Sequence, residues 1–156
     1  YGEGSEAPLF QLRKMIVSKT EKERREALNG LFKYVKKDVK DTLKVMNGHP
    51  VTIRLLDPPL HEFVPHDKEK LRELSKELGI SMGMLNRRVL ALHENNPMLG
   101  HRGVRLGISY PEITEMQVRA IFEATAELVK AGKKAMPEIM VPVTVIAHEL
   151  RHQKEI

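Results

Sequence analysis

The chain has 156 residues, of which 41% are hydrophobic and 30% are charged. This length and balance predict one globular domain, or part of one, with a hydrophobic core. The sequence contains no cysteine, which excludes disulfides, thiolate metal sites and cysteine nucleophiles within this segment. Such a composition fits an intracellular, reducing compartment.

The net charge of +5 and the isoelectric point near 9.5 raise the question of a nucleic-acid partner. In KTEKERRE (19–26) and DKEKLRELSKE (67–77), however, basic residues alternate with acidic ones, as on solvated helix faces. No apolar run approaches the ~20 residues that span a bilayer, and the first residues lack the order of a signal peptide. We therefore expect neither a nucleic acid nor a membrane as partner. The chain does not begin with Met, which suggests a fragment or a processed product.

The first part of the chain is predicted to be helical. Thr20 and Glu23 have the spacing of a capping box, and apolar residues recur at three- and four-residue steps from Leu28 to Met46. This pattern predicts an amphipathic segment of about two helices that ends at Asn47-Gly48.

Strands and helices then alternate. A buried strand is predicted from Val51 to Leu56, stopping at Asp57, because the run is apolar and β-branched and is followed by two prolines. Two helices are expected next, at about 67–78, stopped by Gly79, and at about 82–94, with Ser81 as a candidate N-cap.

The glycine-punctuated stretch NPMLGHRGVRLGISYPE (96–112) could hold a second strand at its centre. A long helix is expected from Pro111 to Gly132, then a third buried strand in EIMVPV (138–143) and the start of another helix. This alternation predicts right-handed crossovers and a parallel sheet, whose active site would lie at the carboxyl ends of the strands.

Two arginines fall at informative places: Arg54 within the first predicted strand, and Arg102 at the start of the second. A charged side chain in an apolar strand is rarely without a partner, so one interpretation is a salt bridge to Asp57 or a surface position on an edge strand. The other is an anion site, because a planar guanidinium grips a carboxylate or phosphate through two hydrogen bonds. For Arg102 the alternatives are a plain turn at GHRG (100–103) and competition from Arg105. Convergence of Arg54 and Arg102 on one small anion is the sharper hypothesis.

The residues AHELRH (147–152) contain His148, Glu149 and His152 in the spacing of a zinc protease. On a helix, histidines four residues apart share a face and can reach one zinc ion, while the glutamate polarises the attacking water. Three fixed residues are a weak pattern, and a third ligand normally lies well downstream, whereas only four residues follow His152. The motif by itself leaves both a zinc site and a chance match open.

Longer stretches are more specific. VTIRLLDPPLHEFVP (51–65), NPMLGHRGVRLGISYPEITEMQVRAIFEA (96–124) and PEIMVPV (137–143) closely resemble the phosphoenolpyruvate (PEP)/pyruvate-binding domain of the pyruvate, phosphate dikinase family of PEP-utilising enzymes. YGEGSEAPLFQLRKMI (1–16) resembles the lead-in to that domain. The resemblance implies an α/β fold, the incomplete opening part of a (β/α)8 TIM-type barrel with about three βα units, preceded and interrupted by helices.

By the same resemblance, residues 1–48 would be a helical lead-in and residues 49–156 the first part of the barrel. Its first three strands would be Val51–Leu56, the segment around Arg102, and Ile139–Val143.

The resemblance also implies roles for single residues. In that family the arginine of T-I-R-L-L-D and the first arginine of G-H-R-G-x-R-L bind the phosphate and carboxylate of PEP, which corresponds here to Arg54 and Arg102, with Asp57 orienting Arg54. The family commonly has V-P-L-V-G-T-x-x-E-L where this chain has VPVTVIAHEL (141–150), so His148 and His152 fall on variable positions. The zinc motif is therefore interpreted as a chance match. The departure at residues 144–146 puts the geometry of the third strand's end in doubt.

The function implied is that of a segment of a phosphotransferase that interconverts ATP, phosphate and pyruvate with AMP, diphosphate and PEP. The family's nucleotide-binding domain, its phosphohistidine domain, its magnesium-binding acids and its cysteine proton donor have no counterpart in this segment. We therefore expect no catalytic residue, no metal site, no bound cofactor and no dikinase activity in the isolated chain; magnesium would belong to the complete enzyme.

Expected partners are PEP or pyruvate, the remaining barrel, and the phosphohistidine and nucleotide-binding domains. An incomplete barrel leaves an open apolar sheet edge, which predicts a homo-oligomer or a rearranged packing. The location would be cytoplasmic, or an organelle such as a plastid or glycosome. Two alternative functions remain: a non-catalytic basic binding or interaction module, and a zinc metallopeptidase built on His148, Glu149 and His152.

Overall fold

The computed structural model describes residues 6–57, 59, 63–64, 67–92 and 100–156. The chain divides into two compact units, the first formed by residues 1–31 and 58–101 and the second by residues 32–57 and 102–156. No helix within the described part of the chain is long and apolar enough to cross a membrane.

The first unit is helical. It contains α1 (Glu6–Val17), the beginning of α2 (Glu21–Val45), α3 (Lys68–Glu77) and α4 (Met82–Ala91). The capping box predicted at the start of α2 is confirmed: the N–H of Glu23 donates to the hydroxyl of Thr20 over 3.2 Å, and the Glu23 carboxylate accepts from the N–H of Thr20 over 3.4 Å. The prediction of two helices after Thr20 is wrong. Because the apolar stripe continues without a break, α2 is a single helix.

The two short helices of this unit begin as the sequence predicts. The side chain of Asp67 caps α3 and that of Ser81 caps α4, each accepting a hydrogen bond from a backbone N–H of the first turn. Helix α4 ends at Ala91, and residues 93–94, which were also expected to be helical, lie outside the described residues. The core of this unit is made of aliphatic side chains, namely Met15, Ile16, Val17, Ala27, Leu28, Leu31, Val64, Leu74 and Leu85.

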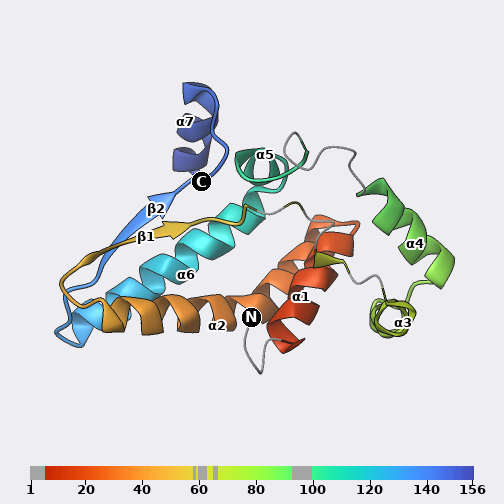
Figure 1. Ribbon diagram of the computed structural model, residues 1–156, viewed down its shortest axis with the longest axis horizontal. Coiled ribbons are helices and arrows are strands. Elements are labelled where there is room, and N and C mark those ends of the chain that lie inside the picture. Colours follow the sequence, from red (N-terminus) through yellow and green to blue (C-terminus); the bar gives the residue numbers. More distant parts are fainter. Residues whose placement is uncertain (1–5, 58, 60–62, 65–66, 93–99) are drawn as a thin grey trace. The chain divides into compact units, whose positions relative to one another are not determined.

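The second unit contains a parallel pair of strands. Strand β1 (Pro50–Arg54) pairs with β2 (Met136–Met140), so that Ile53 lies opposite Ile139 and Arg54 opposite Met140. The parallel pairing is as predicted, although both strands are shorter than expected. Helix α6 (Pro111–Lys130) lies alongside the pair (Figure 1) and contacts β2.

The expectation of fully buried strands is wrong, because exposed and half-buried residues alternate along both. One face of the pair carries Thr52 and Glu138, whose side chains share a hydrogen bond of 2.9 Å. Successive side chains of a strand point to opposite faces. The half-buried side chains, including Ile53 and Ile139, therefore belong to the opposite face.

The prediction of a second strand around Arg102 is also wrong. That segment turns at Gly103, where φ is +56°, and continues as the short helix α5 (Val104–Ser109), which leads through Tyr110 into α6. The apolar residues Val104 and Leu106 are buried, but they belong to a helix and not to a strand. The described part of the chain thus has two strands, and the expected third strand is β2, hydrogen-bonded directly to β1.

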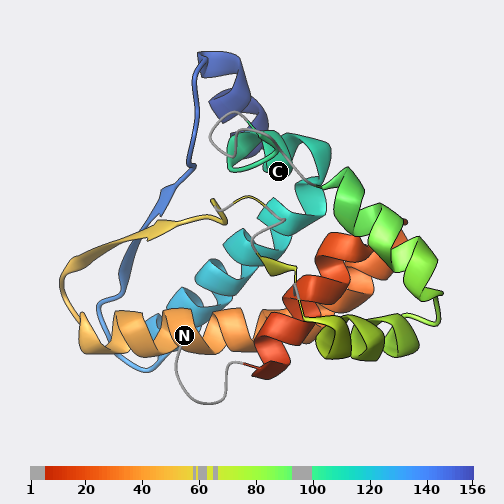
Figure 2. The same ribbon diagram turned by 45° about the vertical axis from the view of Figure 1, so that its right-hand side comes forward.

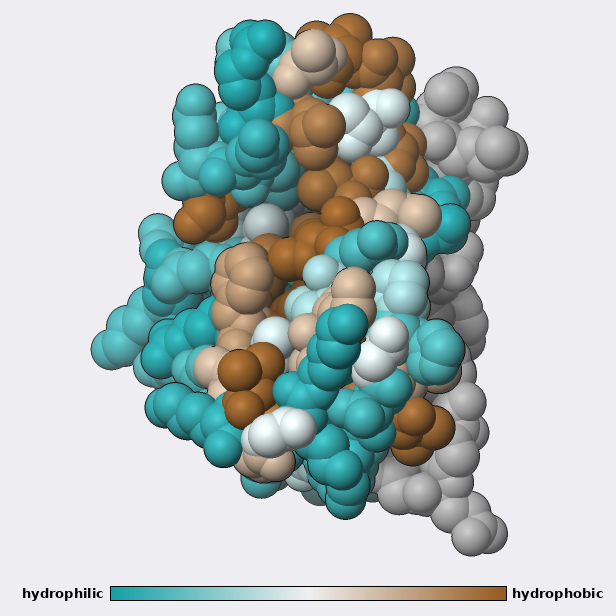
Figure 3. All heavy atoms as spheres, turned by 90° about the vertical axis from the view of Figure 1, so that its left-hand side faces the viewer, coloured by the Kyte–Doolittle hydropathy of each residue, from teal (hydrophilic) through white to brown (hydrophobic). Residues whose placement is uncertain are grey.

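The expected helix at the C-terminal end is confirmed as α7 (Ala147–Glu155). It packs on α5, next to the start of α6, as both ribbon views show (Figures 1 and 2). A groove of about 610 Å³ is lined by β2, α6 and α7, with Phe122, Ile139 and Leu150 among its apolar residues. Apolar side chains gather in the middle of the molecular face drawn in Figure 3.

A cluster of ion pairs joins α2 to α6 within the second unit. The ammonium of Lys36 lies 2.8 Å from the Glu123 carboxylate and 2.6 Å from that of Glu127, and the ammonium of Lys40 lies 2.7 Å from Glu127. Hydrogen bonds from these two lysines lower the pKa of Glu127 from its ordinary 4.5 to about 2. All four side chains are partly exposed, so the surrounding water and salt weaken these pairs.

Truncating a buried side chain in the core of the second unit should strongly lower the stability of the protein. Ile121 is 1% exposed in α6, so Ile121→Ala should lower the free energy of unfolding by about 2–5 kcal/mol through the cavity it leaves. Phe122→Ala is the matched control, because Phe122 is 59% exposed and its truncation should cost much less. Urea denaturation followed by circular dichroism measures both, and equal losses would contradict this packing.

The lysine–glutamate cluster predicts a dependence of stability on pH. A carboxyl whose pKa is lower in the folded than in the unfolded state stabilises the fold above the unfolded-state pKa, and this contribution is lost as pH falls through the folded-state pKa. Between pH 4.5 and about 2, Glu127→Gln should therefore lose less stability than the wild type. Acid titrations of the two proteins test this, and 1 M salt should shrink the difference because it screens exposed charges. If the two proteins lose stability equally with falling pH at low salt, Glu127 is not stabilised by the two lysines.

Candidate functional site

The carboxylate of Asp57 brings the two predicted arginines together at the carboxyl end of β1. Its Oδ2 lies 3.2 Å from Nη1 of Arg54, the last residue of the strand. Its Oδ1 lies 3.0 Å from Nη2 and 3.3 Å from Nε of Arg102. Both guanidiniums therefore bind one carboxylate through different oxygens. The salt bridge between Arg54 and Asp57, which the sequence left as an alternative, is present.

Asp57 holds Arg102 more extensively than it holds Arg54. In addition to the two bonds to the carboxylate, Nε of Arg102 donates to the backbone carbonyl of Asp57 over 3.2 Å. The Arg102 side chain is 22% exposed, whereas that of Arg54 is 61% exposed. Asp57 was expected to orient Arg54. In the structure it also binds Arg102, and over a shorter distance.

The loop that carries Arg102 is attached to the end of β2. The N–H of Val104 donates to the carbonyl of Pro142 over 2.9 Å. A Cβ on Gly103 would lie 2.8 Å from that same carbonyl oxygen and 2.8 Å from Cγ2 of Val143, and its φ of +56° disfavours other residues as well. The glycine is therefore needed for the close approach that sets Arg102 beside Asp57.

Both arginines of the site retain N–H donors that have no partner among the described residues. A guanidinium has five N–H donors, and among the described residues the only partner of Arg54 is Asp57, through Nη1. Arg102 uses Nε and Nη2, so its Nη1 has no partner in the same part of the chain. Together, the two arginines and Asp57 carry one net positive charge and keep several donors for a small anion. The competitor Arg105 lies on α5, where its charge helps to lower the pKa of Glu149.

The end of β2, where the sequence departs from its resemblance, has an unusual backbone. Val143 has a φ of +60°, a conformation that β-branched residues rarely adopt. Beyond it, the hydroxyl of Thr144 donates to the carbonyl of Val141 over 3.2 Å. The chain thus turns sharply at the side of the sheet where Gly103 and Arg102 lie.

The glutamate of the HExxH stretch is engaged in capping its own helix. The Glu149 carboxylate accepts hydrogen bonds from the backbone N–H groups of Val145 over 2.8 Å and Ile146 over 3.1 Å, and these bonds lower its pKa. Nδ1 of His152 lies 3.3 Å from the side-chain amide of Gln153. The part of the chain that the structure describes contains no group of three His, Cys, Asp or Glu side chains placed to hold a metal ion.

Two glutamines near the strand ends are functional candidates that the sequence pattern does not single out. Gln117 of α6 accepts from the N–H of Leu56 over 2.8 Å, and Gln153 of α7 accepts from the hydroxyl of Thr114 over 2.8 Å. A signal for Gln117 did exist, since it lies one turn after buried Ile113 on the face of α6 that carries the apolar stripe. A polar residue in such a stripe needs a partner, but its spacing does not say which.

Comparison with known proteins gives a consistent family. Residues 8–156 match the family of PEP-utilising enzymes in its PEP-binding domain. The chain is 46% identical over 149 residues to pyruvate, phosphate dikinase of Clostridium symbiosum, which covers 95% of the chain and 17% of that protein.

Two further relatives agree. The chain is 49% identical over 151 residues to the chloroplastic pyruvate, phosphate dikinase of Flaveria trinervia, covering 96% of the chain and 16% of the relative. It is 51% identical over 144 residues to the pyruvate, phosphate dikinase of Rhizobium meliloti (strain 1021), covering 92% of the chain and 16% of the relative. The chain therefore spans about a sixth of the length of the curated relatives it matches.

The capping role of Glu149 predicts the response to zinc. Because the described residues place no third ligand beside His148 and His152, and Glu149 is bound to two backbone N–H groups, we expect no saturable zinc-induced shift of the two histidine signals in NMR spectra. A His148→Ala, His152→Ala double variant is the control and should give the same titration elsewhere in the spectrum. Saturation at micromolar zinc in the wild type alone would re-establish the metal site.

Proposed function

The chain belongs to the PEP-utilising enzyme family, within its PEP-binding domain, and on that premise we propose that it is a segment of a pyruvate, phosphate dikinase that binds the anionic groups of PEP or pyruvate. The parent enzyme would be a phosphotransferase that reversibly converts ATP, phosphate and pyruvate to AMP, diphosphate and PEP. The observation that carries the proposal is the convergence of Arg54 and Arg102 on Asp57 at the carboxyl end of β1.

In this proposal Arg54 and Arg102 bind the phosphate and carboxylate of PEP, and Asp57 orients both. A phosphoryl group in transfer spreads charge over its oxygens, and fixed cations stabilise that charge without having to reorganise. Arg54 and Arg102 have donors without a partner among the described residues, which supports this role, because donors already bonded elsewhere could not bind a substrate. Ligands of parallel α/β sheets bind at the carboxyl ends of the strands, which is where these two side chains lie.

We propose further that β1 and β2 are the first strands of a (β/α)8 barrel, with residues 1–48 as lead-in and residues 49–156 as its opening part. The sheet face that bears Thr52, Arg54 and Glu138 would line the barrel interior. Helix α6, beside the strands, would belong to the outer ring. A barrel of that type closes only with further strands, so the proposed partners include the remaining barrel, the phosphohistidine domain and the nucleotide-binding domain.

Magnesium, which the proposed reaction requires, does not fit the acids near this site. Asp57 is engaged by two guanidiniums and Glu138 by the hydroxyl of Thr52, and magnesium prefers free carboxylates together with water. The catalytic residues and metal ligands would therefore lie in other parts of the parent enzyme. The isolated chain is proposed to be inactive as a dikinase, to self-associate through its open sheet edge, and to serve in the cytoplasm or in an organelle.

A general basic binding module has less support. Several cations of the second unit are paired with acids, among them Lys36, Lys40 and Arg119. Paired surface charges attract phosphates weakly, because the neighbouring carboxylates cancel much of their field.

The proposal predicts saturable binding of PEP to this chain. In NMR titrations Arg102→Ala and Arg54→Ala should each weaken PEP binding about tenfold or more, since each removes charge-assisted hydrogen bonds to the ligand. Arg119→Ala is the matched control: it removes the same charge, but its guanidinium lies over Phe32 and pairs with Glu123.

The pattern among the three variants decides the result. Equal weakening by all three would mean that only the overall charge attracts PEP. A folded wild type that gives no saturable response would contradict the proposed binding role of this chain.

A further inference from the structure

We propose that Gln117 is a positioning residue, which holds the end of β1 so that Asp57 can bind Arg102 and Arg54. Its effect on PEP rests on the function proposed above. Its effect on the contact between Asp57 and Arg102 stands on the geometry alone.

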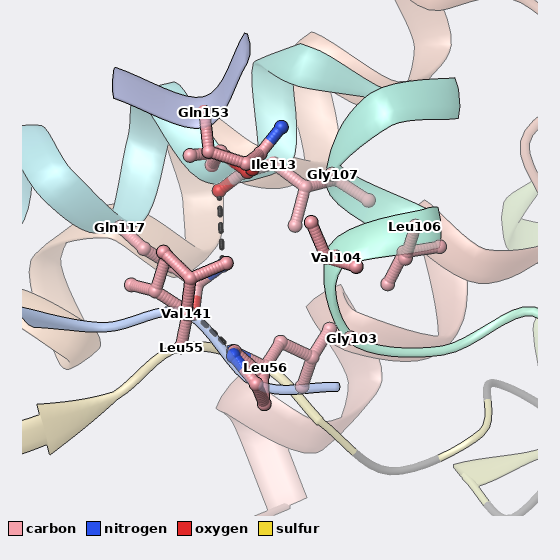
Figure 4. Close-up of a pocket in the computed structure, with 12 residues that line it drawn as sticks. Leu55, Leu56, Gly103, Val104, Leu106, Gly107, Ile113, Gln117, Val141 and Gln153 are labelled. Carbon is pink, nitrogen blue, oxygen red and sulfur yellow. Dashed lines mark hydrogen bonds between the residues drawn. The ribbon is translucent and has the colours of Figure 1, made fainter. Parts of the chain in front are cut away.

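The side-chain amide of Gln117 joins α6 to the strand end. Its Oε1 accepts from the N–H of Leu56 over 2.8 Å, and its Nε2 donates to the carbonyl of Ile113, one turn earlier in α6, over 3.1 Å (Figure 4). Leu56 offers a donor and Ile113 an acceptor, so each can bond to the Gln117 amide in only one of its two orientations. The two bonds together therefore fix the oxygen of Gln117 toward the strand.

The N–H of Leu56 needs a partner that the sheet does not supply. The last bond of the strand pair runs from the N–H of Leu55 to the carbonyl of Met140, over 3.0 Å. Leu56 follows immediately, is partly buried, and donates to Gln117 instead. Because an unpaired buried N–H is costly, this bond determines how the chain leaves the sheet.

Asp57 is the next residue, and it presents two acceptors to Arg102. Its carbonyl lies 3.2 Å from Nε of Arg102, and its Oδ1 lies 3.0 Å from Nη2. Backbone carbonyl and carboxylate keep this joint geometry only while the backbone at residues 56–57 stays in place. Releasing Leu56 would therefore loosen both contacts at once.

Water can hardly replace the amide of Gln117. The cavity beside Gln117 and Leu56, drawn in Figure 4, has a volume of about 10 Å³, at the lower limit for one water molecule. Thr114 and Gln153 line the same cavity and form a buried hydrogen bond of 2.8 Å with each other. Thr114 thus offers a matched control on the same helix, since its hydroxyl bonds to α7 and not to β1.

The test compares Gln117→Leu with Thr114→Val in this chain, both with ¹⁵N-labelled arginine. Without ligand, Gln117→Leu should move the Nε–H signal of Arg102 toward its position in an Asp57→Ala variant, whereas Thr114→Val should leave it in place. Gln117→Glu keeps an acceptor for Leu56 but loses the donor to Ile113, so its Arg102 signal should lie between those of the wild type and Gln117→Leu. Its added charge makes it unsuitable for comparing affinity for an anion.

The second readout is the affinity for PEP. Gln117→Leu should weaken PEP binding about tenfold, as the loss of an orienting partner does for metal-binding side chains, while Thr114→Val should not, even where both variants unfold at the same lower urea concentration. An unchanged Arg102 signal in Gln117→Leu would overturn the inference, as would equal effects of the two variants. If the wild type fails to bind PEP but the Arg102 signal still moves, the positioning role stands and the proposed function fails.

Discussion

The carboxylate of Asp57, held between two guanidiniums, is the contact on which the arrangement of the site depends. Its side chain is 14% exposed and accepts from Arg54 through one oxygen and from Arg102 through the other. Arg54 reaches it from the strand and Arg102 from a loop 45 residues further along the chain. Two cations this close would repel each other, so the carboxylate between them allows both to remain while one positive charge stays available.

One face of the strand pair is exposed and polar, and Arg54 lies on it. A strand pair covered on both faces would be apolar throughout, whereas here Thr52 and Glu138 stand on one face and share a hydrogen bond. Arg54 is on that same face, at the end of its strand. Polar side chains on one face and α6 beside the pair suit the barrel proposed above, because inward and outward residues alternate along every barrel strand.

The HExxH stretch illustrates how a motif depends on its surroundings. The spacing of His148, Glu149 and His152 is that of a zinc protease, and the predicted helix is indeed present as α7. What decides the role of Glu149 is the backbone just before the helix, where two N–H groups point at its carboxylate. A glutamate in the first turn of a helix can accept hydrogen bonds from the preceding backbone N–H groups wherever these lack other partners. The resemblance predicts a coincidence, and in the structure Glu149 caps its own helix.

The sequence by itself determined the local elements and the family. Capping residues, helix stops and the β-branched run are short-range signals, so α3, α4, α6 and β1 lie where they were predicted. It also identified Arg54, Asp57 and Arg102 as one group, through motifs that resemble a known family. The tertiary structure decided that Arg102 comes from a loop before a helix, that β2 pairs directly with β1, and that Gln117 takes the N–H of Leu56. These last facts depend on contacts between residues far apart in the chain, about which spacing along the sequence carries no information.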